Sequence, residues 1–243
     1  MPSQSPPESV AENQTATEAE HMTARLLARR IDHTMLRPEA RRADIERVCR
    51  EAVHFGCATV CVNPVWVALA SELLDGTSVK VVAVIGFPFG ASLTAAKVFE
   101  TELAVRDGAD EIDMVVAIGQ LKDGDLSFVS SDIAAVVQAA AGRPVKVVLE
   151  CGLLSDDEKR TAVDISAGAG AVFVKTATGF LGSGATIHDV RLMHRAARGR
   201  LAVKATGGIR FFEDAIALLD AGASRLGASR TEAVLSSRDG HEL

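Results

Sequence analysis

Short apolar runs alternate with amphipathic segments along most of this chain of 243 residues. Eight runs have the length and apolar character of strands, and they span Arg30–Met35, Ala58–Asn63, Lys80–Phe87, Glu111–Val116, Val145–Cys151, Ala171–Thr178, Leu201–Thr206 and Ser224–Ser229. Several intervening segments have the apolar spacing of a helix, namely Leu93–Arg106, Asp132–Ala141, Asp156–Ala167, Ile187–Ala197 and Phe211–Leu219. The pattern predicts strands and helices in regular alternation.

Glycines stand where the predicted helices should stop, at Gly108, Gly142, Gly168 and Gly222. Eight strand–helix units, spaced by roughly 20–35 residues, predict an α/β fold, a (β/α)₈ TIM barrel in a single domain, which typically needs about 250 residues. A doubly wound sheet is the alternative. Its dinucleotide-binding form is disfavoured because no Gly-x-Gly-x-x-Gly motif follows an early predicted strand.

The two ends of the chain differ from the rest. Residues 1–22 are rich in Pro, Ser, Glu, Gln and Thr and have no apolar periodicity, which predicts a disordered N-terminal extension. We therefore expect the barrel to span residues 23–235, followed by a C-terminal tail at residues 236–243.

Composition narrows the range of partners. The net charge of −6 and the low aromatic content of 4% argue against a nucleic-acid binder. The most apolar stretch, residues 57–74, contains Asn63, Pro64 and Glu72 and lacks the roughly 20 apolar residues of a membrane span. The start of the chain lacks a signal-peptide pattern. The four cysteines form no Cys-x-x-Cys pair, so we expect reduced, packed thiols and a cytoplasmic location.

Alternation within the predicted strands places charged residues on one face. The opposite face is apolar and should pack on the helices, so the charged face should point into the barrel. Three lysines and three carboxylates would then converge there, namely Lys146, Lys175, Lys204, Glu111, Asp113 and Glu150. The alternative interpretation is that these charges end the strands at a solvated rim.

Lysine is used selectively at these positions. The chain has only seven lysines against nineteen arginines, yet Lys146, Lys175 and Lys204 follow one another on successive predicted strands at 29-residue intervals. A lysine can lose its proton and attack a carbonyl carbon, whereas an arginine cannot. Burial and a like-charged neighbour both disfavour the ammonium form, which prepares a lysine for Schiff-base chemistry.

Glycine-rich turns follow the last three predicted strands, at Thr178-Gly179-Phe180, Thr206-Gly207-Gly208 and Gly227-Ala228-Ser229. The last of these opens a short segment, Thr231–Leu235. In barrels of this type a phosphate site is common at such turns, so we expect one here, with Arg210 or Arg230 adding positive charge.

The assembled motifs resemble those of the deoxyribose-phosphate aldolase family. The matching stretches are Ile31-Asp32-His33-Thr34, Cys61-Val62-Asn63-Pro64, Gly86-Phe87-Pro88-Phe89-Gly90, Gly108-Ala109-Asp110-Glu111-Ile112-Asp113, Val145-Lys146-Val147-Val148-Leu149-Glu150, Phe173-Val174-Lys175-Thr176, Thr178-Gly179-Phe180, Val203-Lys204-Ala205, Gly207-Gly208-Ile209-Arg210 and Gly227-Ala228-Ser229. They occur in the family's order from about residue 25 to residue 235 and are jointly highly specific.

The resemblance implies a class I aldolase that needs neither a metal nor another cofactor. Such an enzyme reversibly cleaves 2-deoxy-D-ribose 5-phosphate to acetaldehyde and D-glyceraldehyde 3-phosphate, a step in deoxyribose phosphate catabolism. By the resemblance, Lys175 forms the Schiff base, Lys204 lowers the pKa of Lys175 and assists proton transfer, and Asp113 handles protons through an ordered water. Lys146 and Asp32 support this polar network.

The resemblance further implies that the backbone around Gly179, Gly207 and Gly208, together with Ser229, holds the phosphate. The implied partners are small phosphosugar and aldehyde substrates, and a second copy of the chain in a homodimer or larger homo-oligomer. This sequence departs from the family pattern at Ala177, Thr206, Cys151 and Arg230, none of which replaces an implied catalytic group.

Two other functions stay open on the residues alone. The same lysines could serve another phosphosugar enzyme, such as an isomerase or a related lyase, although enolisation favours a carboxylate base. A non-enzymatic sugar-phosphate binding protein is the other, because a fold does not determine a function. A metal-dependent class II aldolase is disfavoured because the sequence has no evident histidine cluster. His33 is interpreted as a hydrogen-bonded structural histidine.

Overall fold

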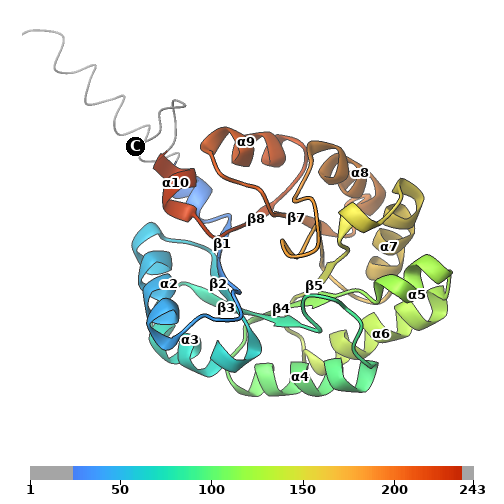
Figure 1. Cartoon of the computed structure of the whole chain (residues 1–243), viewed down its shortest axis with the longest axis horizontal. Coiled ribbons are helices and arrows are strands. Elements are labelled where there is room, and N and C mark those ends of the chain that lie inside the picture. The colour runs from blue at the N-terminus through green and yellow to red at the C-terminus, as the bar shows by residue number, and fades with distance from the viewer. Residues whose placement is uncertain (1–23, 237–243) are drawn as a thin grey trace, which may run out of the picture.

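The chain folds into a closed barrel of eight parallel strands within residues 24–236, which are the residues that the computed structural model describes (Figure 1). The strands run in sequence order around the barrel, and β8 pairs with β1 to close it. They are β1 (Ile31–Met35), β2 (Thr59–Val62), β3 (Lys80–Ile85), β4 (Glu111–Val115), β5 (Val145–Val148), β6 (Phe173–Lys175), β7 (Ala202–Thr206) and β8 (Arg225–Ala228). The predicted single-domain TIM barrel is confirmed.

Helices connect successive strands and form the outer layer of the barrel (Figure 1). They are α2 (Arg42–Phe55), α3 (Val67–Leu74), α4 (Thr94–Arg106), α5 (Ile118–Asp123), α6 (Leu126–Ala139), α7 (Asp156–Gly168), α8 (Ile187–Ala197), α9 (Phe212–Asp220) and α10 (Thr231–Ser236), with short 3₁₀ helices at Pro64–Trp66 and Cys151–Leu153. A further helical turn covers residues 24–28. The expected N-terminal extension, residues 1–22, and most of the expected C-terminal tail, residues 237–243, lie outside the described residues.

The start of α6 and the end of α7 differ from the sequence prediction for identifiable reasons. Helix α6 begins at Leu126 rather than at Asp132, because the Asp125 side chain accepts a hydrogen bond from the Phe128 N–H and caps the helix there. Gly168 is the last residue of α7 rather than its stop, and Gly170 takes the left-handed conformation with φ of +90°. The other three glycines predicted as stops do have positive φ.

The strands separate an outer apolar layer from a mixed interior. One large cluster of buried apolar side chains packs the outward face of the strands against the helices. A second, smaller cluster lies apart from it and consists of Leu36, Cys61, Val82 and Val84, with Phe87 packed against them. Because Cys61, Val82 and Val84 alternate with the outward residues of β2 and β3, these two strands supply an apolar wall inside the barrel.

Two sequence expectations about the whole chain can be compared with the described residues. All four cysteines are buried free thiols, as predicted. None of the helices within residues 24–236 has the length and apolar character that a membrane crossing requires.

Candidate active site

The buried carboxylate of Asp113 contacts three lysine side chains inside the barrel. Its Oδ1 lies 2.8 Å from the Nζ of Lys146, and its Oδ2 lies 3.0 Å from the Nζ of Lys175 and 2.8 Å from the Nζ of Lys204. All four side chains are at most 1% exposed. Four of the six residues predicted to converge inside the barrel are therefore in direct contact, and the solvated-rim interpretation of these lysines is wrong.

Strand register explains how residues far apart in sequence meet. Asp113 of β4 pairs with Lys146 of β5, and Lys175 of β6 pairs with Lys204 of β7. Paired residues of neighbouring strands lie at the same level and point to the same side of the sheet. Lys175 is the last residue of β6, so its amine lies at the carboxyl end of the strand. Active sites of this architecture occur at that end.

Three more charged groups extend the cluster. Lys204 also contacts the buried carboxylate of Asp32, which accepts a hydrogen bond from Arg225 at 2.7 Å. Lys146 also lies 2.6 Å from the Oε2 of Glu111, and Arg225 lies 3.7 Å from the same oxygen. The predicted supporting residues Asp32 and Lys146 thus belong to one network with Asp113, Lys175 and Lys204.

Opposite charges control ionisation in this cluster. Burial alone would raise the pKa of Asp113, but the positive charges of Lys146 and Lys204 outweigh it and hold that pKa well below the usual range. The pKa of Asp32 is also lowered, because the positive charges of Lys204, Lys146 and Arg225 together outweigh the effect of burial. Burial would lower the pKa of Lys204 and of Lys146, yet the carboxylates raise both. In the resting cluster Lys146 and Lys204 are therefore cations, and Asp32 and Asp113 are anions.

Arg225 was not singled out from the sequence, although its signal was there. It lies two residues before Gly227 on β8, and the two share a face of the strand. Its guanidinium group is 5.8 Å from the ring centre of Phe173, and the Nζ of Lys146 is 5.9 Å from the same centre. Applying the alternation argument to β8 would have placed Arg225 in the barrel beside Lys204, its partner in the register.

The expected place of Glu150 is corrected by the structure. Strand β5 ends at Val148, and Glu150 has a left-handed backbone with φ of +57°. The strict alternation that put Glu150 on the lysine face therefore ends before it. Its carboxylate is buried, but it accepts hydrogen bonds from the Thr178 N–H at 2.9 Å and from the Thr178 hydroxyl at 2.5 Å. Glu150 holds the turn after β6 instead of joining the lysines.

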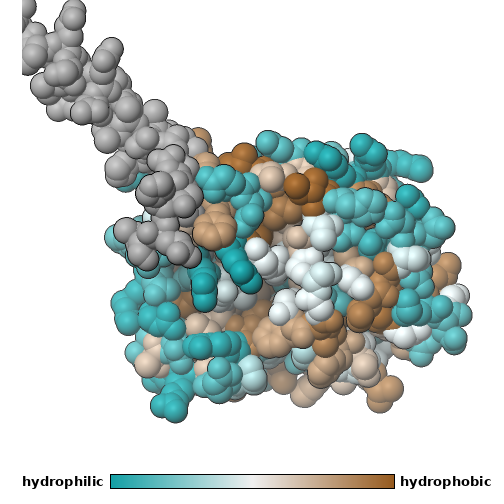
Figure 2. All heavy atoms as spheres, turned by 45° about the horizontal axis from the view of Figure 1, so that its top comes forward, coloured by the Kyte–Doolittle hydropathy of each residue, from teal (hydrophilic) through white to brown (hydrophobic). Residues whose placement is uncertain are grey.

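A cavity of about 550 Å³ lies at the carboxyl ends of β1, β6, β7 and β8. Its lining includes all four residues expected at the phosphate, namely Gly179, Gly207, Gly208 and Ser229. Figure 2 shows a hollow near the middle of the molecule, where pale residues of intermediate hydropathy lie beside hydrophilic ones. Lys175 is the last residue of β6 and Lys204 lies two residues before the end of β7. Thr178 and Thr206, which follow these lysines closely in sequence, line the cavity.

Arginines give one side of this cavity a positive charge. Arg230 lines it, as expected for one of the two arginines considered, whereas Arg210 is not among its lining residues. Arg37 and Arg47 line it as well, and sequence reasoning missed both. Their signal is weak, because both lie in the segment after β1, far in sequence from the glycine-rich turns. Arg47 is held by Asp44 at 3.0 Å.

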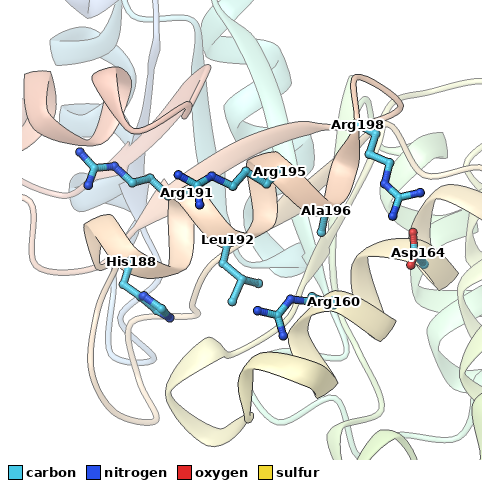
Figure 3. A pocket seen from close by; sticks show the side chains of 8 residues that line it. All are labelled: Arg160, Asp164, His188, Arg191, Leu192, Arg195, Ala196 and Arg198. Atoms are coloured by element: carbon cyan, nitrogen blue, oxygen red, sulfur yellow. The ribbon is translucent and has the colours of Figure 1, made fainter.

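A second hollow of about 580 Å³ lies on the outside of the barrel between α7 and α8. Its lining is rich in arginine and consists of Arg160, Asp164, His188, Arg191, Leu192, Arg195, Ala196 and Arg198. The guanidinium groups do not converge: Arg191 and Arg195 extend to one side of α8, whereas Arg198 extends toward Asp164 (Figure 3). No lysine lines the hollow, and arginine cannot act as an amine nucleophile, so this is not a site for Schiff-base chemistry.

Comparisons with known proteins point to one family. A family model described as DeoC/LacD family aldolase matches residues 26–236. The deoxyribose-phosphate aldolase of Exiguobacterium sibiricum is 54% identical over 211 residues, which make up 86% of this chain and 96% of that protein. Deoxyribose-phosphate aldolase 1 of Bacillus licheniformis is 52% identical over 204 residues, which make up 84% of this chain and 92% of that protein.

A solved structure supports the same relationship. The deoxyribose phosphate aldolase of Aeropyrum pernix, described as having a unique tetrameric structure, superposes with a TM-score of 0.83 at 33% sequence identity. The superposition covers 90% of this chain and 95% of that one.

Proposed function

Because the chain belongs to the DeoC/LacD aldolase family, we propose that Lys175 is the Schiff-base lysine of an enzyme that reversibly cleaves 2-deoxy-D-ribose 5-phosphate. The products are acetaldehyde and D-glyceraldehyde 3-phosphate. The enzyme is a lyase of the deoxyribose-phosphate aldolase type, and two of its relatives are named deoxyribose-phosphate aldolases. The residue roles that follow are our proposal.

One observation carries the choice of Lys175. The cluster contains four cationic side chains and three carboxylates, so one positive charge has no matching negative charge. Lys146, Lys204 and Arg225 each contact two carboxylates, whereas Lys175 contacts Asp113 alone, at 3.0 Å. Loss of a proton from Lys175 balances the charge of the cluster and breaks the fewest ion pairs. Lys175 is therefore the amine most readily available as a nucleophile.

The reaction then follows from amine chemistry. The neutral Nζ of Lys175 adds to the aldehyde carbon, C1, of the open-chain sugar to give a carbinolamine. Its hydroxyl group takes up a proton and leaves as water, which gives an iminium ion. The C2–C3 bond breaks, its electron pair moves into the C1–C2 bond, and the C3 hydroxyl loses its proton. D-glyceraldehyde 3-phosphate leaves and an enamine remains on Lys175. Protonation of the enamine at C2 and hydrolysis of the resulting iminium release acetaldehyde and restore the amine.

The proton transfers at the carbinolamine hydroxyl, the C3 hydroxyl and C2 need a positioned acid or base. We assign them to Lys204 and to Asp113 acting through an ordered water. Lys204 is paired with Lys175 in the register, so its charged amine lies beside the amine that attacks the carbonyl carbon. One oxygen of Asp113 accepts hydrogen bonds from both amines, so the carboxylate can stabilise whichever of the two carries the proton. Lys146 forms an ion pair with Asp113, and Asp32 forms one with Lys204, so these two supporting residues keep Asp113 and Lys204 in place.

The phosphate lies away from the reacting carbons and supplies binding energy for orientation. We assign it to the backbone around Gly179, Gly207 and Gly208 and to the Ser229 hydroxyl, because all four line one cavity. Gly207 and Gly208 have φ of +95° and +80°, a conformation that favours glycine, and neither has a side chain that would keep an anion away from the backbone. Arg230 adds positive charge at the same end of the cavity.

We further propose that the enzyme is a homo-oligomer that works in the cytoplasm. The tetramer described for the Aeropyrum pernix relative supports the first proposal, and light scattering of the purified chain tests it. The four unpaired thiols support the second.

The Schiff base is tested directly by trapping. The protein is incubated with acetaldehyde and sodium borohydride, and its intact mass is measured. We expect one stable two-carbon adduct, located on Lys175 by peptide mapping, and none in the Lys175→Ala variant. Lys122→Ala is the matched control, because Lys122 is an exposed lysine outside the cluster, and it should keep the adduct.

The contrary result is equally clear. If the folded wild-type protein forms no adduct, the class I mechanism is wrong, and an isomerase or a sugar-phosphate binding protein becomes the better interpretation. The cleavage assay is repeated in excess chelator, where activity should be unchanged because the iminium, not a metal ion, accepts the electron pair.

A further inference from the structure

The buried imidazole of His33 joins two helices that flank the cavity. Its Nε2 lies 2.8 Å from the Oε2 of Glu51 on α2, and its Nδ1 lies 2.7 Å from the hydroxyl oxygen of Thr231 on α10. His33 is 3% exposed and Thr231 is fully buried. The expectation that His33 is hydrogen-bonded is thus confirmed, and its partners come from opposite ends of the sequence.

We infer that His33 is a positioning residue for the phosphate end of the cavity and that it acts through Thr231. This inference rests on the proposed function, because it takes the cavity around Ser229 as the phosphate site. His33 does not touch the cavity itself. It contacts Thr231, the residue that follows Ser229 and Arg230, and these two residues do line the cavity.

The segment in question, Ser229 and Arg230, connects β8 to α10 and lines the cavity. At its start, Ala228 pairs with His33 in the ladder between β8 and β1. At its end, Thr231 begins α10, and the Val234 N–H donates to the Arg230 carbonyl at 3.1 Å. Helix α10 has only six residues, so its own hydrogen bonds fix its place weakly. The buried Val234 side chain packs α10 on the core, and the His33 contact adds the side-chain hydrogen bond that fixes Thr231, the residue next to Ser229 and Arg230.

The other side of the imidazole leads back to the cavity. Glu51, which accepts from the Nε2–H of His33, also accepts from Arg47 at 3.4 Å, and Arg47 lines the cavity. Because Glu51 can only accept, Nε2 carries a proton, and in the neutral ring Nδ1 accepts from the Thr231 hydroxyl. One ring thus fixes α10 relative to α2, and these helices lie on the same side of the barrel beside β1 and β8 (Figure 1).

The test compares a phosphorylated substrate with its unphosphorylated counterpart. Thr231→Val removes the hydroxyl and keeps the side-chain shape. We expect KM for 2-deoxyribose 5-phosphate to rise about tenfold, the effect of one lost buried hydrogen bond, while kcat stays within about twofold. The kcat/KM for 2-deoxyribose, which has no phosphate, should not change. Thr231→Ser keeps the hydroxyl, so its KM should stay close to that of the wild type.

A matched control separates positioning from stability. Thr101 is also fully buried, and its hydroxyl donates to the Lys97 carbonyl within α4 at 2.7 Å. Thr101→Val should lower the melting temperature to a similar extent as Thr231→Val without changing KM. His33→Gln provides a second variant, and it should raise KM for the phosphorylated substrate in the same direction.

The inference is overturned if Thr231→Val affects both substrates equally, or if it lowers only the melting temperature. Either result is distinct from failure of the proposed function. That failure would appear in the wild type, as absence of the trapped adduct or of any preference for the phosphorylated substrate.

Discussion

The Nζ of Lys175 lies 3.0 Å from the Oδ2 of Asp113, and within residues 24–236 this is the only ion pair of that lysine. The same oxygen lies 2.8 Å from Lys204, which has a second carboxylate partner. Two lysines on adjacent strands thus share one acceptor but differ in the number of carboxylates that they contact. In the proposed mechanism this difference separates the nucleophile, Lys175, from its cationic neighbour, Lys204.

The first prediction concerns Lys204. Replacing it with glutamine removes the positive charge beside Lys175 and, in the proposed mechanism, a group that assists proton transfer. We expect Lys204→Gln to lower kcat by about 10²–10⁴-fold, the range for loss of a positioned acid or base. Steady-state cleavage assays measure this, with Lys80→Gln, at an exposed lysine of β3, as the control. A kcat within a few-fold of wild type would remove Lys204 from the mechanism.

The second prediction follows from the ionisation of Asp32. Its pKa is lowered in the folded state, so its ionised form stabilises the fold above the unfolded-state pKa of about 3.9 and loses that contribution as the pH falls. Asp32→Asn is less stable at neutral pH, but the difference in unfolding free energy should shrink by about 1 kcal/mol between pH 6 and pH 3. Urea unfolding at both pH values measures it, and a constant difference would contradict the assignment.

At alkaline pH the sign reverses for the lysines. The pKa of Lys204 is raised in the folded state, so its charged form stabilises the fold below the unfolded-state pKa of about 10.4, and this contribution is lost as the pH rises through the folded-state value. Asp32→Asn weakens the carboxylate environment of Lys204. The variant should therefore unfold at a lower alkaline pH than the wild type.

The third prediction concerns the four thiols. Burial raises the pKa of Cys49 and of Cys61 to about 11, and the pKa of Cys57 and of Cys151 to about 12. The thiolate is the reactive form, so the native protein should react very slowly with iodoacetamide at pH 8. Four alkylations should occur after unfolding in urea. Rapid labelling of any cysteine in the native protein, read by mass spectrometry, would contradict the burial of that thiol.

The fourth prediction concerns a buried ion pair outside the site. The Nζ of Lys97 on α4 lies 2.6 Å from Asp132 on α6 and donates to the Val115 carbonyl at the end of β4, two residues after Asp113. Lys97→Met leaves the Asp132 carboxylate buried without its cation and should lower the unfolding free energy by about 3–5 kcal/mol. The double variant Lys97→Met/Asp132→Leu should lose less than the sum of the two single changes.

An exposed ion pair serves as the comparison for this cycle. Arg42 and Glu46 lie 3.8 Å apart on the surface of α2, and Arg42→Met should cost no more than about 0.5 kcal/mol. Urea unfolding of all variants measures the difference. Additive losses at Lys97 and Asp132 would mean that the two side chains do not interact energetically.

Much of the architecture could be predicted from residue order alone. Apolar runs and helical segments alternate because each strand must bury one face on a helix, and this pattern identified all eight strands. The period of two residues in a strand put Lys146, Lys175 and Lys204 on the inner face, since the opposite face had to be apolar. The choice of lysine over arginine indicated amine chemistry. The four residues expected at a phosphate, namely Gly179, Gly207, Gly208 and Ser229, also line one cavity.

Tertiary structure alone decided at which level along the barrel axis each charged side chain lies. The intervals from Lys146 to Lys175 and from Lys175 to Lys204 are equal in sequence, yet Lys175 pairs with Lys204 while Lys146 pairs with Phe173. Loops and helices between strands absorb length differently, and the stagger of a closed barrel sets the register. Equal spacing therefore cannot tell which lysine has Asp113 as its single partner.

Contacts between the ends of the chain were likewise beyond sequence reasoning. The closure of β8 on β1 brings Thr231 to His33 and Arg225 to Asp32, across nearly the whole length of the chain. Local patterns reveal which face a residue occupies, because that depends on its neighbours in sequence. Which partner it meets depends on the path of every element in between, so only the folded barrel determines it.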